Sequence, residues 1–365
     1  MPDKSEKNKN LHTMQNRIGA PCVKRNLTII TTTACFVVAI LIITLFGCNF
    51  SGGPKARLGH LPITTFGIFF PDPNHLGTHA YGSGFSEAGG IVYTCKAGHL
   101  DIDHIRGNAD LTRYLAKKIR KSLSKNTKGF SFSLTGEFSS HKILFTYPQN
   151  WNTEPEKDKI IEEISLGTAP YLAYNATMWH EILTWFGVHF GVFEPEFNSA
   201  FSWEDVYSNL LGTRLGVEAM KSPDQNFDKA MTIAIQRQLK ELQVRPRSTA
   251  IYASGKVRGQ WYTGNFIPDT KMRNFDIGLD GFVTPTLVPG IEGCNSQPLP
   301  LPVPTLDILK QHGFSMSYEI KPNVLEQGRI FEAAGSKKIF PEKHYPVLLK
   351  YMKAEAVQKG YKYDE

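Results

Sequence analysis

The clearest pattern in the chain of 365 residues is a run of apolar positions near its start. Residues 27–46 carry no charged side chain and would span about 30 Å as a helix, the thickness of a bilayer core. The residues before this run are mostly basic where they are charged: Lys4, Lys7, Lys9, Arg17, Lys24 and Arg25 against Asp3 and Glu6. A cationic flank of this kind stays in the cytoplasm. Residues 1–47 are therefore predicted to be a signal peptide or a membrane anchor.

The end of the apolar run distinguishes between these two possibilities. Leu45-Phe46-Gly47-Cys48 resembles the processing signal of lipoproteins, in which a small residue directly precedes the cysteine. In such proteins the cysteine is acylated and becomes the new N-terminus. The pattern favours lipidation of Cys48 over an uncleaved anchor. Asn49 follows instead of Asp, which predicts a cell-envelope protein on the periplasmic face of the outer membrane.

Beyond a flexible tether at residues 48–60, the pattern predicts a single α+β globular domain over residues 61–365. Its helical middle carries short strands on both flanks. Strands are expected at 61–70 and 90–95, and a hairpin at 131–134 and 142–147. Helices are expected at 99–124, 156–166, 170–187, 202–220 and 224–243, and from about 343. Pro170 is expected to separate two of them because it lacks an amide donor. From about 247, strand-like pieces alternate with Gly and Pro.

The charge balance excludes one class of partner. The net charge is +7, but +4 of it precedes the apolar run, which leaves +3 for the remainder of the chain. The basic residues of that remainder are spread out. We therefore expect the membrane as a partner, through the N-terminal lipid or anchor, and no nucleic acid.

Two cysteines remain in the exported part once Cys48 is acylated. Cys95 and Cys294 could form one long-range disulfide in an oxidising compartment, or remain two separate buried thiols. In the second case Cys95 could act as a nucleophile with His99, His104 or His180 as its base.

A polar stripe crosses the otherwise apolar helix expected at 170–187. Thr177, His180, Glu181 and Thr184 follow the i, i+3, i+4, i+7 spacing that places side chains on one helical face. The stripe is either the solvent side of a core helix or a polar site in the interior. The second histidine of the zinc-protease pattern HExxH is replaced by Thr184, so ligands would have to come from elsewhere.

The nearest such ligands are Asp101 and His104, which one helical face can present together. They suggest a site for a divalent metal such as zinc, with Asp101, His104 and His180 as ligands and Glu181 as catalytic base. Asp103 is expected to form an exposed ion pair with Arg106. The acids Glu204 and Asp205 are explained by the helix dipole and a capping box with Ser202.

Four segments carry a resemblance to a known family. They are GGIVYTCKAGHLDIDHIRGNADLTRYLAKKI, ATMWHEILTWFG, FSWEDVYSNLLGTRLG and FDIGLDGFVTPTLVP, in this order. Together they resemble an uncharacterised family of bacterial lipoproteins that is defined as a domain of unknown function. The resemblance implies an exported bacterial protein and brings no established activity.

Two classes of function therefore stay open, with a third behind them. The first is a metal-dependent hydrolase that acts on an envelope component. The second is a non-catalytic envelope lipoprotein, a binding or scaffolding module whose polar stripe is structural. The third is a cysteine hydrolase that uses Cys95.

We predict that Cys48 is acylated and that residues 1–47 are removed. Mass spectrometry of the protein extracted from bacterial membranes should find an N-terminal peptide that begins at Cys48 and carries fatty acyl chains. The Cys48→Ala variant should keep residues 1–47. An unmodified Cys48 within an uncleaved chain would contradict the prediction.

Overall fold

The computed structural model describes residues 53–364 except 55, 56, 58, 65–69, 83, 85, 135, 136, 138, 188–196, 224, 265–268 and 323–326. These residues belong to the compact unit Asn49–Glu365, and the apolar run and Cys48 lie outside the described residues. Within the described part, no helix combines the length and apolar character needed to cross a membrane.

The structure is an α+β fold, as predicted, with its longest helices in the middle of the chain. The helices are α2 (Ile102–Ser124), α3 (Lys157–Phe186), α4 (Asp205–Lys221), α5 (Phe227–Glu241), α6 (Arg247–Val257), α7 (Asp307–Gln311), α8 (Gln327–Ala334) and α9 (Pro341–Gln358), with a 3₁₀ turn η2 (Trp151–Thr153). The strands are β1 (Ile91–Thr94), β2 (Gly98–Asp101), β3 (Gly129–Phe132), β4 (Ser140–Thr146), β5 (Met272–Asn274), β6 (Phe282–Val283), β7 (Leu301–Pro302), β8 (Ser315–Lys321) and β9 (Lys362–Asp364).

The strands form small separate sheets. β3, β4 and β8 make an antiparallel sheet in that order, which pairs the predicted hairpin with a strand from much later in the chain. β1 pairs with β2 and β6 with β7, both antiparallel, and β5 pairs with β9 in parallel. The β1–β2 hairpin leads directly into α2, so the predicted helix at 99–124 begins three residues later than expected.

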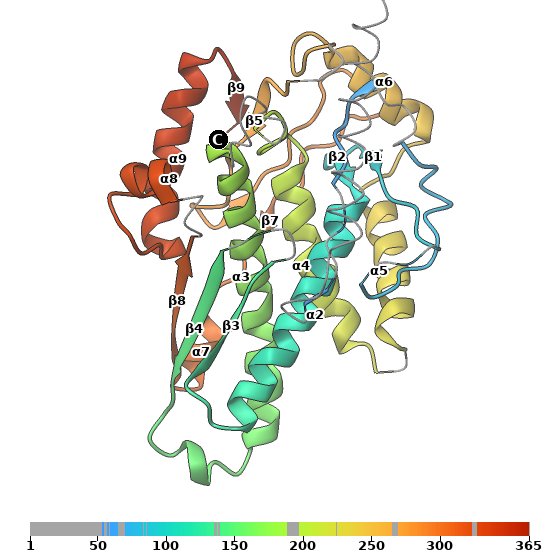
Figure 1. The fold of residues 1–365 in the computed structure, drawn as a ribbon. Coiled ribbons are helices and arrows are strands. Elements are labelled where there is room, and N and C mark those ends of the chain that lie inside the picture. Colours follow the sequence, from blue (N-terminus) through green and yellow to red (C-terminus); the bar gives the residue numbers. More distant parts are fainter. Residues whose placement is uncertain are drawn as a thin grey trace, which may run out of the picture. The chain divides into compact units, whose positions relative to one another are not determined.

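The core is built around α2, α3 and α4, which pack against one another, while α5 packs against α4 (Figure 1). α2 is amphipathic and buries residues such as Ile105, Ala109 and Leu115 in this core. The α2–α4 contact is unusually close. A Cβ atom on Gly212 would lie 2.4 Å from the carbonyl oxygen of Ile105, and one on Gly216 would lie 2.9 Å from the Cα atom of Ala109. The two glycines therefore set how closely these helices approach.

The predicted helix break at Pro170 is wrong, because α3 runs unbroken through it. Proline removes one backbone hydrogen bond and disfavours a helix interior by about 3 kcal/mol. The residues on both sides of it, including Thr168, Ala169 and Leu172, are buried in the core. Burial of α3 along its whole length thus outweighs the local preference for a break.

Two further expectations differ from the structure. Residues 61–64 contain no strand, and 65–69 lie outside the described residues. The helix α6 replaces the first of the strand-like pieces expected from about 247.

Cys95 and Cys294 form a disulfide with their Cα atoms 4.9 Å apart, within the reach that such a bond requires. The disulfide removes Cys95 as a nucleophile, and with it the cysteine-hydrolase hypothesis.

We predict opposite effects for two helical Gly→Ala substitutions. Gly212→Ala should destabilise the protein by about 1–3 kcal/mol, because the added methyl group overpacks the α2–α4 contact. Gly107→Ala on α2 is the control, since its added Cβ meets nothing within 4 Å. It should stabilise by up to about 1 kcal/mol through helix propensity. Urea unfolding followed by circular dichroism measures both, and an equal effect of the two changes would contradict the close contact.

Candidate functional site

Asp101 occupies the junction between β2 and α2. It is the N-cap of α2, and its Oδ1 accepts hydrogen bonds from the backbone amides of Asp103 at 2.7 Å and His104 at 3.4 Å. Its Oδ2 accepts from the amide of His60 at 2.5 Å. The side chain is completely buried, and burial raises its pKa above the usual range even though His104 lies nearby.

His104 lies one turn into α2 and faces two carboxylates. Its Nδ1 is 3.2 Å from Asp205 Oδ1 and 3.8 Å from Asp101 Oδ2. Burial disfavours a charged imidazole, but the charges of Asp101 and Asp205 prevail and raise the pKa of His104 well above its usual value. The predicted pairing of Asp101 with His104 on one helical face is therefore present, and Asp205 joins it.

Asp205 and Glu204 enter from the start of α4. Asp205 Oδ2 accepts a hydrogen bond from the amide of Ser202 at 2.8 Å, which is one half of the predicted capping box. The other half does not form, because the N-cap residue of α4 is Glu204 and the Ser202 hydroxyl donates elsewhere. Glu204 Oε1 accepts from the Ser202 hydroxyl at 2.5 Å. Glu204 Oε2 is buried and has no hydrogen-bond partner among the described residues. Burial and the neighbouring charge of Asp205 raise the pKa of Glu204 well above its usual range.

Glu181 comes from the last turns of α3. It is buried, and its Oε2 accepts a hydrogen bond from the amide of Phe201 at 2.8 Å. Burial and the charge of Asp205 raise the pKa of Glu181 to about 7, while His180 and His104 act in the opposite direction. Glu181 therefore lies close enough to Asp205, His180 and His104 for their charges to interact.

His60 and Asp103 complete the group from the side nearest to solvent. His60 Nδ1 lies 3.0 Å from Asp103 Oδ2, and both side chains are partly exposed. The structure brings together one donor atom from each of three residues, His60, Asp101 and Asp103, and these three atoms lie within 4.8 Å of one another. Against expectation, Asp103 does not pair with Arg106 at the surface. Arg106 is buried and contacts Glu87.

His180 does not join this group. Consecutive helical residues point about 100° apart, so His180 and Glu181 face different surroundings. His180 is half-exposed, and its Nδ1 lies 2.8 Å from Glu137 Oε1, next to the sheet formed by β3, β4 and β8. Glu137 also lies 3.7 Å from His141 Nε2, and these two histidines lower its pKa although burial opposes the shift. The expected participation of His180 with Asp101 and His104 is thus not what the structure shows.

The group as a whole has a large excess of negative charge. We call the following seven residues the acidic cluster: His60, Asp101, Asp103, His104, Glu181, Glu204 and Asp205. It contains five carboxylates and two imidazoles. The N-termini of α2 and α4 offset part of the negative charge, because each carries a partial positive charge of roughly one half. A buried carboxylate without a compensating charge is costly, so the acidic cluster must bind protons or a cation.

A second buried network, formed by Arg57, His79, Glu87, Arg106 and Asp110, shows the opposite balance. Arg57 donates to Asp110 at 2.6 Å and to Glu87 at 3.0 Å, and Arg106 contacts Glu87 at 2.9 Å. His79 lies 3.1 Å from Asp110 and 3.2 Å from Glu87. Two arginines and a histidine thus match two carboxylates, and this network needs no further ion. It also fixes Arg57, within the segment predicted to be a flexible tether.

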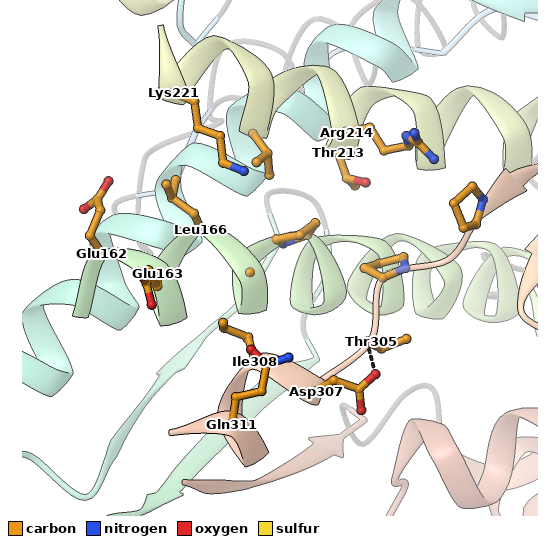
Figure 2. A pocket seen from close by; sticks show the side chains of 15 residues that line it. Glu162, Glu163, Leu166, Thr213, Arg214, Lys221, Thr305, Asp307, Ile308 and Gln311 are labelled. Carbon is orange, nitrogen blue, oxygen red and sulfur yellow. Dashed lines mark hydrogen bonds between the residues drawn. The ribbon is translucent and has the colours of Figure 1, made fainter. Parts of the chain in front are cut away.

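A pocket of about 650 Å³ lies elsewhere in the fold, between α3, α4 and the segment that enters α7 (Figure 2). Figure 2 shows Arg214 and Lys221 on α4, with Glu162 and Glu163 on α3. Apolar side chains such as Leu166 and Ile308 line it as well. None of its lining residues belongs to the acidic cluster, so the pocket and the cluster are separate features.

Four members of the acidic cluster had no role in the predicted metal site: His60, Asp103, Glu204 and Asp205. Asp205 and Glu204 were explained by the helix dipole and a capping box, and the structure shows that Asp205, the first residue of α4, binds the amide of Ser202 and faces His104. His60 lay in the presumed tether, where no periodicity marks it. A usable signal was the density of acids beside aromatic residues at 201–205, because helix capping requires one carboxylate there and the sequence supplies two.

Comparison with protein-family profiles places residues 47–286 in the family described as "Protein of unknown function (DUF4056)". The match covers more than half of the chain, and the chain belongs to this uncharacterised family. The matched region includes every residue of the acidic cluster. Searches of curated proteins and of solved structures returned no match.

We predict that Glu87 makes stability depend on pH. Burial opposes ionisation of Glu87, but hydrogen bonds from His79 and Arg57 lower its pKa far below the usual range. The stability it contributes is therefore present above about pH 4.5 and lost as the pH falls through its lowered pKa.

Glu87→Gln should cost about 3–5 kcal/mol at pH 7, because it leaves the buried Arg106 without its carboxylate partner and leaves Arg57 with only one of its two carboxylates, Asp110. It should also reduce the loss of stability on acidification. Denaturant unfolding between pH 3 and pH 7 measures both effects. The exposed pair Lys159–Glu156 supplies a control, since Glu156→Gln should change stability by less than about 1 kcal/mol.

Proposed function

We propose that the protein is a metal-dependent hydrolase of the bacterial cell envelope, tethered through an acylated Cys48. The observation that carries the proposal is the convergence of Asp101 and Asp205 on Nδ1 of His104. Two ligand atoms on a tetrahedral zinc ion with bonds near 2 Å are about 3.3 Å apart. The separations of 3.2 Å and 3.8 Å match two of the three ligand pairs, and a cation that contacts all three side chains would require the Asp101 and Asp205 oxygens to move toward each other.

The charge of the acidic cluster supports the same conclusion. Without a cation, five carboxylates can lower their mutual repulsion only by binding protons. A divalent cation would offset part of this charge and attract the Oε2 atom of Glu204, which is buried and has no hydrogen-bond partner within the described part of the chain. The mixture of imidazole and carboxylate donors suits zinc and manganese. This donor set uses Asp205 in the place that the sequence suggested for His180.

Glu181 is the proposed general base. Its pKa near 7 allows it to take up and release a proton at neutral pH. A cation on Asp101, His104 and Asp205 would act as a Lewis acid and acidify a coordinated water. Glu181 would accept the proton as that water attacks a carbonyl or phosphoryl group. The side chains of His60, Asp103 and His104 are 20%, 14% and 22% exposed, which leaves a route from solvent.

The cellular location rests on separate observations. The apolar run and the Leu-Phe-Gly-Cys sequence before Asn49 favour export and lipidation. The Cys95–Cys294 disulfide is consistent with an oxidising compartment outside the cytoplasm. We therefore propose the periplasmic face of the outer membrane as the location and an envelope component as the substrate.

A non-catalytic binding lipoprotein is the second candidate, and the pocket of Figure 2 favours it. The pocket combines an apolar lining with charged side chains of both signs, Arg214 and Lys221 against Glu162, Glu163 and Asp307. This composition suits a small ligand with an apolar part and polar groups. This candidate predicts neither metal binding by the acidic cluster nor an effect of Glu181→Gln.

We predict that the full-length protein, purified in detergent, binds zinc and that His104→Ala abolishes binding at the Asp101–His104–Asp205 site. His180→Ala should retain the metal, because His180 contacts Glu137 instead. Inductively coupled plasma mass spectrometry after dialysis against zinc measures the content. An unchanged zinc content in His104→Ala would refute the proposed ligand set.

Glu181→Gln should keep the metal but lower hydrolysis by about 10²–10⁴-fold, the usual contribution of a general base. The assay incubates the zinc-loaded protein with peptidoglycan sacculi or phospholipid vesicles and identifies products by mass spectrometry. Metal binding without hydrolysis of either material would leave the metal site standing and exclude these two substrates.

A further inference from the structure

The acidic cluster contains a second set of donor atoms, distinct from the one centred on His104. His60, Asp101 and Asp103 each offer one donor atom, and these atoms lie within 4.8 Å of one another. The closest pair is His60 Nδ1 and Asp103 Oδ2, at 3.0 Å. A histidine with two carboxylates is again a donor set that divalent cations accept.

The two donor sets share one residue. Asp101 Oδ2 lies 3.8 Å from Nδ1 of His104, and the same oxygen accepts a hydrogen bond from the backbone amide of His60. His60, through its backbone amide, and His104, through its imidazole, therefore both lie near the same side-chain oxygen of Asp101. A carboxylate between two donor sets is the usual bridge in two-metal sites, whose ions lie about 3.5–4 Å apart.

The backbone around the cluster makes room for both sets. A Cβ atom on Gly59 would lie 2.2 Å from Nε2 of His104, and one on Gly89 would lie 1.8 Å from Asp103 Oδ2. A larger residue at either position would displace the side chain of His104 or Asp103, so the chain passes directly against one ligand candidate of each set. The amide of Gly90 also donates to Asp103 Oδ2 at 2.9 Å and helps to orient it.

The unpaired oxygen of Glu204 is a further, independent observation. Its carboxylate is 1% exposed and close enough to Asp101 and Asp205 for their charges to interact. No described residue donates a hydrogen bond to its Oε2. With neutral imidazoles, a single divalent cation would leave most of the negative charge of the five carboxylates uncompensated. Two divalent cations would bring the cluster close to neutrality.

We propose that the acidic cluster holds two divalent cations bridged by Asp101, the first on His104 and Asp205 and the second on His60 and Asp103. This inference rests on the proposed metal site and adds a second ion to it. The second ion would lie between His60 and Asp103, whose side chains are both partly exposed, and there it would contact the substrate and orient the scissile group toward the water activated at the first.

The test is the metal stoichiometry of the detergent-purified full chain. Wild type and the control His180→Ala should bind two equivalents of zinc, and His60→Ala and Asp103→Asn should bind one. Asp101→Asn should weaken both sites by at least about tenfold while it preserves α2, because asparagine is an equally good N-cap. Circular dichroism checks that each variant is folded.

A second readout reports the distance between the ions. In the manganese-loaded protein, electron paramagnetic resonance should show an exchange-coupled pair in wild type and isolated ions in His60→Ala. The outcomes separate the two proposals. One equivalent in both wild type and His60→Ala would overturn the second site and leave the first. Loss of all metal in His60→Ala would mean a single site, and also overturns the inference. No metal in wild type would overturn both.

Discussion

The need to compensate buried negative charge governs the region where β2, α2, α3 and α4 meet. Asp101 ends a strand and caps α2, and Asp205 begins α4 and binds the amide of Ser202, so both carboxylates have structural roles where these helices start. The glycines of α4 bring that helix against α2, which draws the two helix starts together. The packing that stabilises the core therefore also concentrates the acids. Their charge cannot be reduced by moving apart, since that would separate the helices.

The two buried polar groups of the protein illustrate different solutions to the same problem. In the network of Arg57 and Glu87, each carboxylate is paired with guanidinium and imidazole groups, and hydrogen bonds use most of the available oxygens. The carboxylates of this network are compensated by cationic groups of the chain itself, and the network connects residue 57 to α2, although Nε and Nη1 of Arg106 have no hydrogen-bond partner among the described residues. The acidic cluster lacks arginine at comparable positions. Arg273 is a buried guanidinium whose charge interacts with Asp205, but it donates to the carbonyl of Ala200 and contacts Asp269. Because of this difference in charged side chains, we interpret the network of Arg57 and Glu87 as structural and the acidic cluster as a candidate binding site.

Much of the fold could be predicted from local patterns, because amphipathic periodicity marks α2, α4 and α5 and alternation marks the β3–β4 hairpin. The unbroken passage of α3 through Pro170 could not, since it depends on burial by distant residues. For the site, helical spacing was sufficient to group Asp101 with His104 and to select Glu181. Helical spacing did not predict that Glu181 and His180 have different surroundings. His180 lies next to the sheet of β3, β4 and β8, where it contacts Glu137.

The contribution of His60 was the least accessible from sequence. Nothing about an isolated histidine in a Gly- and Pro-containing stretch indicates that its amide and imidazole both contact residues some forty positions further on. Such long-range contacts are set by tertiary structure, and a single sequence does not encode them in any periodic form. Asp205 was not predicted as a ligand because its place at the start of a helix already explained it. A structural role does not exclude a role in a site.

The position of Arg57 has a geometric consequence for a protein anchored at Cys48. Arg57 is fixed by buried ion pairs only nine residues after that cysteine. Nine residues of fully extended chain reach at most about 30 Å. A protein acylated at Cys48 therefore cannot extend far from the lipid surface, and His60, three residues beyond Arg57, stays within the same layer. Polymers or lipids that lie next to the membrane would be within range of the acidic cluster, whereas structures deeper in the periplasm would have to approach it.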